Sequence, residues 1–165
     1  MLAVSLAESM ERYFAFGGCS HEELVRLREI LEPETAALAA ENANPEDVAR
    51  LRELVDQIET TFAIGDVEAY AAADTGFHEM LAVASHNKLL IAVVAGLEKV
   101  MRVWIRSQSE LFRLGESVRT HRTVCDAVAA GDRDAAREAM TLHMRFTRST
   151  LLNQGERPGA GNQPG

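Results

Sequence analysis

Residues 120–144, "THRTVCDAVAAGDRDAAREAMTLHM", have the pattern of two amphipathic helices separated at Gly131 and Asp132. Glycine readily ends a helix, and an aspartate directly after it can cap the next one. Helices joined by so short a link are usually antiparallel neighbours. The stretch therefore predicts a helical hairpin, with one helix over about 116–130 and the last over about 133–152.

This hairpin would place two histidines at the same height. His121 lies ten positions before Gly131 and His143 lies twelve after it. At about 1.5 Å per residue, these separations are about 15 and 18 Å of helix. Both histidines have apolar neighbours at helical spacing, so we expect both imidazoles to point toward the core.

The same helical period runs through the rest of the chain, and no alternating run makes a convincing strand. Ser20 and Glu23 form a capping box, and Asn44 before Pro45 is a second helix start. Pro33 predicts a kink or a break. The expected earlier helices cover about 2–16, 21–42, 45–64, 67–84 and 88–112. The sequence thus predicts an all-α antiparallel bundle of about six to seven helices.

Composition limits the classes of partner. The chain has 17 Lys plus Arg against 25 Asp plus Glu, for a formal charge of −8, so no broad phosphate-binding surface is expected. Its apolar runs are too short to span a bilayer, the first residues do not resemble a signal peptide, and its two cysteines form no metal or disulfide pattern. We expect a cytoplasmic protein without membrane contact. The polar, Gly- and Pro-rich tail 153–165 is expected to be disordered.

A further polar feature, besides His121 and His143, is "DTGFHEML" (74–81), in which Asp74 and His78 are four apart and share one helix face. If this helix packs beside the hairpin, these two residues meet His121 and His143. One carboxylate and three imidazoles suit a divalent transition metal such as Zn, Ni, Mn or Fe, with zinc expected in a purified sample. The alternative is that these histidines are buried and hydrogen-bonded to a backbone carbonyl or an aspartate, without metal.

Three stretches resemble a known family. These are "LREILEPETAALAAENA" (27–43), "DTGFHEMLAVASHNKLL" (74–90) and the hairpin stretch, and they are similar to the effector-binding FCD domain of GntR-type, FadR-subgroup bacterial transcription regulators. The resemblance covers residues 2–152. It implies a bundle that encloses a central ligand and metal cavity. It also implies that Asp74, His78, His121 and His143 are the metal ligands.

The resemblance further implies an effector carboxylate bound by Arg28, whose planar guanidinium suits the task. The alternative for Arg28 is a solvated helix arginine paired with Glu32. Arg102 is expected to line the cavity. Asn87 matches a family asparagine at a helix break, although a helix N-cap is an equal alternative.

These implications make the chain a sensor of a small organic acid, acting as a homodimer and not as an enzyme. It would contact DNA only through a winged helix-turn-helix domain, which is missing here and expected upstream in a larger regulator. The alternative is a standalone sensor. Two alternatives stay open: a metal-dependent enzyme on a small carboxylate, and a metal-stabilised helical interaction module. The residues do not name the effector, the physiological metal or the operator.

Overall fold

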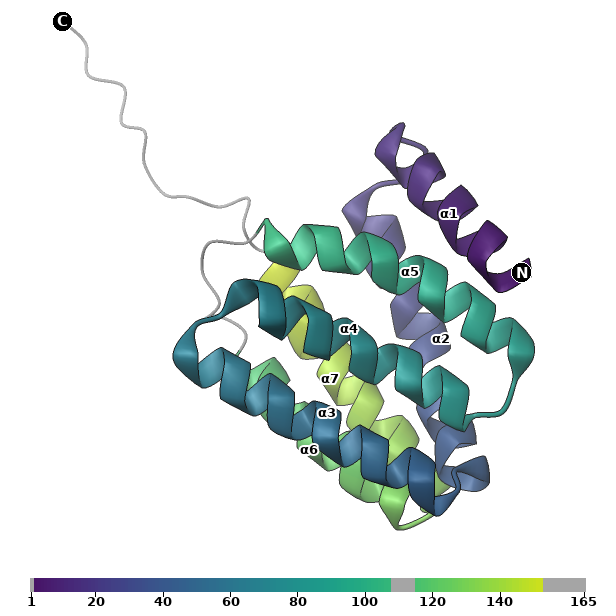
Figure 1. The fold of residues 1–165 in the computed structure, drawn as a ribbon, viewed down its shortest axis with the longest axis vertical. Helices are drawn as coiled ribbons and strands as arrows, with labels where there is room; N and C mark the ends of the chain where they lie inside the picture. Colours follow the sequence, from purple (N-terminus) through teal and green to yellow (C-terminus); the bar gives the residue numbers. More distant parts are fainter. Residues whose placement is uncertain (1, 108–114, 153–165) are drawn as a thin grey trace, which may run out of the picture.

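The computed structural model describes residues 2–107 and 115–152, which form seven helices and no strand (Figure 1). They are α1 (Leu2–Ala15), α2 (His21–Asn42), α3 (Pro45–Ile64), α4 (Val67–Ala84), α5 (Lys88–Arg106), α6 (Gly115–Ala129) and α7 (Arg133–Leu152). The all-α prediction is confirmed, and the helix bounds agree closely. The predicted end of the fifth helix at 108–112 and the predicted disordered tail lie outside the described residues.

The helices form a bundle in which α3, α4 and α5 lie side by side, with α2, α6 and α7 behind them (Figure 1). Helix α7 packs on α2 and α6, whereas α1 packs mainly on α5. Small residues of α2 allow close approach, since Ala36, Ala37 and Ala39 are fully buried. Larger side chains fill the space between the layers, among them Phe77, Leu81, Met101, Met140 and Met144. This core surrounds the polar residues considered below.

The expected turn and cap signals position the helix ends. The backbone N–H of Ser20 donates to Glu23 Oε2 at 2.7 Å, and Glu23 N–H donates back to Ser20 Oγ at 3.2 Å. Gly131 adopts a φ of +68°, which suits a residue without a side chain. Of the kink or break predicted at Pro33, the break is wrong, because α2 runs through this residue. Pro33 is buried, and packing along the length of α2 offsets the one backbone hydrogen bond that proline cannot make.

Asn44→Ala should lower the free energy of unfolding by about 1 kcal/mol, the usual effect of losing an N-cap. Asn44 Oδ1 accepts from the backbone N–H groups of Glu46 and Asp47 at 2.9 Å, and alanine cannot replace it. Urea denaturation would measure the change. Asn42→Ala, two residues earlier on an exposed side chain, is the control and should stay within about 0.5 kcal/mol. Equal stability losses in both variants would contradict the capping role.

Candidate metal centre

Three helices bring the four predicted ligands together. Helix α4 carries Asp74 and His78, α6 carries His121, and α7 carries His143. His78 Nε2 lies 3.3 Å from His143 Nε2, and Asp74 Oδ1 lies 3.1 Å from His121 Nε2. The ring centroids of His121 and His143 are 4.3 Å apart, as the hairpin geometry predicted. All four side chains are buried. Their convergence agrees with the sequence; metal binding itself stays a prediction.

The hydrogen bonds of two histidines indicate where their ring protons lie. His78 Nδ1 is 2.8 Å from Glu32 Oε2, and an ionised carboxylate can only accept, so Nδ1 carries the proton. The Thr120 hydroxyl donates to the Ser117 carbonyl at 2.7 Å and therefore accepts from His143 Nδ1 at 2.8 Å. Both Nε2 atoms are thus left with lone pairs that face each other across 3.3 Å.

His121 adds two ring nitrogens, unpartnered in the described part of the chain, to the cluster of His78 and His143. Its side chain is fully buried, and neither ring nitrogen has a hydrogen-bond partner among the described residues. The 3.1 Å contact with Asp74 is close but is not aligned as a hydrogen bond. Buried polar atoms without partners are unfavourable, by about 1–3 kcal/mol each. A cation between these nitrogens would satisfy them, and three imidazoles with one carboxylate are a fitting donor set for a divalent transition metal.

The pKa values of these residues favour the protonation states that metal binding requires. Burial lowers the pKa of His78. It lowers the pKa of His143 to a greater extent, because the neighbouring histidines and Arg28 add to the effect. Both imidazoles are therefore neutral near pH 7, as a metal ligand must be. Burial raises the pKa of Asp74, but the contact with His121 and the nearby His78 and Arg28 outweigh it and leave a value of about 2. Asp74 is therefore an ionised carboxylate.

Arg28 of α2 lies against this centre. Its Nε is 2.9 Å from Glu32 Oε1 and 3.0 Å from Glu98 Oε1, and all three side chains are buried. The ion pair with Glu32 is thus present, but it is buried where the alternative interpretation expected it solvated. Arg28 Nη2 has no hydrogen-bond partner among the described residues. A buried guanidinium with a spare donor, beside a candidate cation site, is a suitable partner for an anion.

Glu98 is a buried carboxyl group beside the centre that was not predicted from the sequence. Its side chain is fully buried, and burial raises its pKa well above the usual range. The available signal was its register, because Val94, Met101 and Ile105 share its face of α5 and are buried. Glu98 and Glu32 lie near His78 and form a second group of candidate metal ligands. The raised pKa of Glu98 favours its neutral form, and the Arg28 guanidinium balances the charge of Glu32, so a second cation there would be repelled.

The structure does not bring Arg102 and Asn87 to the centre. Arg102 follows the buried Met101, so the helical turn directs its side chain away from the core. The side chain is 45% exposed and lies 3.4 Å from Glu68. Asn87 is the N-cap of α5 and accepts from the backbone N–H groups of Leu89 and Leu90. Asn87 thus makes the N-cap that the alternative expected, and neither Asn87 nor Arg102 is among the residues that line the central cavity. Their effector role stays a prediction.

The cavity at the centre is small. Arg28, Asp74, His78 and His143 are among the residues that line it, and its volume is about 10 Å³. That is about the minimum space for one water molecule or ion and is far too small for an organic acid.

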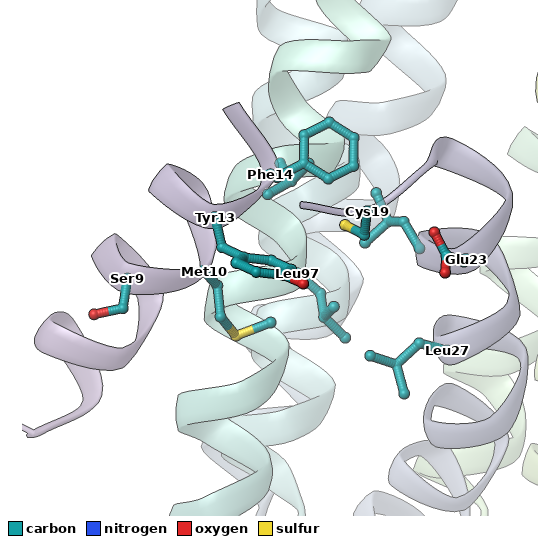
Figure 2. A pocket seen from close by; sticks show the side chains of 10 residues that line it. Ser9, Met10, Tyr13, Phe14, Cys19, Glu23, Leu27 and Leu97 are labelled. Carbon is teal, nitrogen blue, oxygen red and sulfur yellow. The ribbon is translucent and has the colours of Figure 1, made fainter. Parts of the chain in front are cut away.

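A larger pocket of about 480 Å³ lies elsewhere, between α1, α2 and α5. Figure 2 shows Met10 and Tyr13 of α1 beside Leu97 of α5, with Leu27 of α2 across from them. Its lining is almost entirely apolar, and it contains none of the predicted ligands.

Comparison with known proteins gives a family match. The family model described as the FCD domain matches residues 23–146. The "Putative L-lactate dehydrogenase operon regulatory protein" of Escherichia coli (strain K12) is 30% identical over 134 residues, which are 78% of this chain and 50% of that protein. The "HTH-type transcriptional regulator LutR" of Bacillus subtilis (strain 168) is 30% identical over 139 residues, 79% of this chain and 61% of that protein.

A solved structure is also similar. "Streptococcus agalactiae GntR" superposes with a TM-score of 0.69 at 26% identity, over 78% of this chain and 57% of that one. The chain thus spans about half to three fifths of the length of these relatives. The two curated names describe regulators, in agreement with the expectation of a non-enzymatic domain. Among the described residues, no helix has the length and hydrophobicity needed to cross a bilayer.

Proposed function

Because the chain belongs to the FCD domain family, we propose that it is the effector-sensing domain of a GntR-type, FadR-subgroup transcription regulator. In this proposal Asp74, His78, His121 and His143 hold a divalent transition metal, and a small organic acid binds beside it. The domain forms a homodimer, and its occupancy is transmitted to DNA-binding domains carried elsewhere in the full-length protein.

One observation carries the metal site. The Nε2 atoms of His78 and His143 face each other at 3.3 Å, and the hydrogen bonds to Glu32 and Thr120 leave both without a proton. Two facing lone pairs repel each other in a buried site unless a cation lies between them. His121 supplies a further nitrogen without a hydrogen-bond partner at the same point.

The proposed binding of an organic acid rests on the net charge of the centre and on Arg28. A divalent ion held by these four residues would attract a carboxylate oxygen as a further ligand. Arg28 Nη2 offers the second oxygen a charge-assisted hydrogen bond from the wall of the same cavity. The cation, Arg28, Asp74 and Glu32 sum to one positive charge when Glu98 is neutral, the form that its raised pKa favours. One monocarboxylate would balance that charge.

The small cavity indicates how binding could act as a signal. A volume of about 10 Å³ has no room for an organic acid, so the bundle must open to admit one. An effector then binds the open form better than the closed one, and that difference in affinity is what shifts the population. The helices that bear the cavity wall would carry this shift to the dimer and its DNA-binding domains.

The same small cavity favours a second candidate function, a metal-stabilised helical interaction module without a small-molecule effector. Zinc-loaded protein would be titrated calorimetrically with acetate and L-lactate to separate the two. The sensor requires saturable binding that disappears when the metal is removed. Absence of carboxylate binding to protein that holds zinc would favour the interaction module.

Zinc addition should raise the melting temperature of chelator-treated protein. Binding to the folded state alone contributes about 2.7 kcal/mol at a free metal concentration of 100 times Kd. Differential scanning calorimetry would measure the shift, and elemental analysis of protein purified without chelator would give the stoichiometry. Magnesium is the control, because imidazole-rich sites bind it poorly. A melting temperature that zinc leaves unchanged, with no metal in the sample, would overturn the metal site.

A further inference from the structure

We propose that Glu32 is the positioning residue for the metal ligand His78, holding its imidazole in the one tautomer that can bind the ion. This inference rests on the metal site of the proposed function. It assigns a role to a buried carboxylate that the sequence presented only as an ion partner of Arg28.

Glu32 reaches His78 from another helix. It lies on α2, whereas His78 lies on α4, and the contact joins residues 46 positions apart at 2.8 Å. Both side chains are buried, so water does not compete for the hydrogen bond. The second oxygen, Glu32 Oε1, accepts from Arg28 Nε at 2.9 Å. The carboxylate is therefore held from both sides and cannot rotate away from the imidazole.

The consequence for the ligand follows from the chemistry of a neutral imidazole, which has one N–H and one lone pair. With the N–H on Nδ1 and directed at Glu32, the lone pair lies on Nε2, the atom 3.3 Å from His143 Nε2. Without Glu32, the proton would be free to occupy Nε2 and block coordination. A carboxylate partner also increases the basicity of a metal-bound imidazole.

Glu32→Gln separates this role from simple packing, because glutamine has the same size. The amide has one oxygen and one NH₂ group, and the Arg28 guanidinium has the stronger demand for the oxygen. The NH₂ group would then face His78 Nδ1, which must become the acceptor. The proton moves to Nε2, so the geometry is retained with the wrong tautomer, as happens when an amide replaces the aspartate of a serine-protease triad.

The matched control is Glu98→Gln. Glu98 is as buried as Glu32 and lies 3.0 Å from the same Arg28 Nε, but it makes no hydrogen bond to a histidine. Both substitutions replace one buried carboxyl group beside the same guanidinium. Glu32→Gln also removes a negative charge, because the raised pKa of Glu98 favours its neutral form. The tautomer of His78, read together with the zinc affinity, therefore isolates the contact with His78.

The experiment has two readouts on the 165-residue chain. Long-range ¹H–¹⁵N NMR of the metal-free protein reports the tautomer of His78, with the proton expected on Nδ1 in the wild type and in Glu98→Gln and on Nε2 in Glu32→Gln. Competition with a chromophoric chelator gives the zinc Kd, which should weaken at least about tenfold in Glu32→Gln and change less than about threefold in Glu98→Gln.

Two results would overturn the inference alone: a proton on Nε2 of His78 in the wild type, or equal zinc affinities of Glu32→Gln and the wild type. The wild-type tautomer provides a test even if Glu32→Gln does not fold. A wild-type chain that binds no zinc would instead overturn the proposed metal site, so the two failures are distinguishable.

Discussion

Replacing His121 with alanine should weaken zinc binding by more than about 100-fold, beyond the roughly 10- to 100-fold lost with a hydrogen-bond partner of a ligand. His121 is the ligand whose ring nitrogens have no hydrogen-bond partner among the described residues, so its imidazole is wholly available to the ion. Removing it also deprives Asp74 of the imidazole that lies 3.1 Å from its Oδ1. Elemental analysis after dialysis against trace zinc would show loss of the bound equivalent.

His21→Ala is the control for this experiment. His21 is an exposed imidazole that packs against the rings of Phe14 and Trp104, whereas the four predicted ligands are buried. It should retain one zinc per chain. Retention of stoichiometric, tight zinc by His121→Ala would show that the ion binds elsewhere and would remove the support for the proposed centre.

Arg28→Ala should lower the free energy of unfolding by about 3–5 kcal/mol, the range for removing one partner of a buried ion pair. The reason is the Glu32 carboxylate, which Arg28 would leave fully buried without its ion partner, beside the buried and neutral Glu98. Burial raises the pKa of a carboxyl without a cation, so Glu32 must either protonate or stay unfavourably charged. Guanidinium chloride denaturation of the metal-free chain would measure the loss.

Arg102→Ala is the matched control, because Arg102 also pairs with a glutamate but on the surface. Its side chain is 45% exposed and that of Glu68 is 56% exposed, so solvent screens the pair and the expected change is below about 1 kcal/mol. Comparable losses in the two variants would contradict the buried network. They would also remove the physical basis for proposing that Arg28, and not Arg102, binds the effector carboxylate.

Local signals in the sequence were enough for the helices and for the placement of the histidines. The capping box at Ser20, the N-cap at Asn44 and the turn at Gly131 each depend on residues within a few positions of one another, and these positions were predicted correctly. The hairpin turn sets His121 and His143 level through helix geometry alone. Asp74 and His78 share a face for the same reason. Four side chains could therefore be nominated for one site before any tertiary contact was known.

Local rules failed where the environment of a residue is set by a distant helix. Pro33 does not interrupt α2, because the packing of α2 outweighs one missing hydrogen bond. Arg28 and Arg102 have the same charge in similar helical patterns, but α2 turns one inward and α5 turns the other outward. Glu98 looks like an ordinary surface glutamate in sequence, and only its buried neighbours on α5 distinguish it.

Helix periods, caps and turns are short-range properties, so the amino-acid sequence was sufficient for the all-α bundle and for the set of four candidate ligands. The tertiary structure was needed for the second set of contacts, in which Glu32 and Thr120 orient the imidazoles of His78 and His143. It was also needed to find that the cavity holds about 10 Å³. The physical reason is that a ring proton, a pKa and a cavity depend on atoms brought together from helices far apart in the chain.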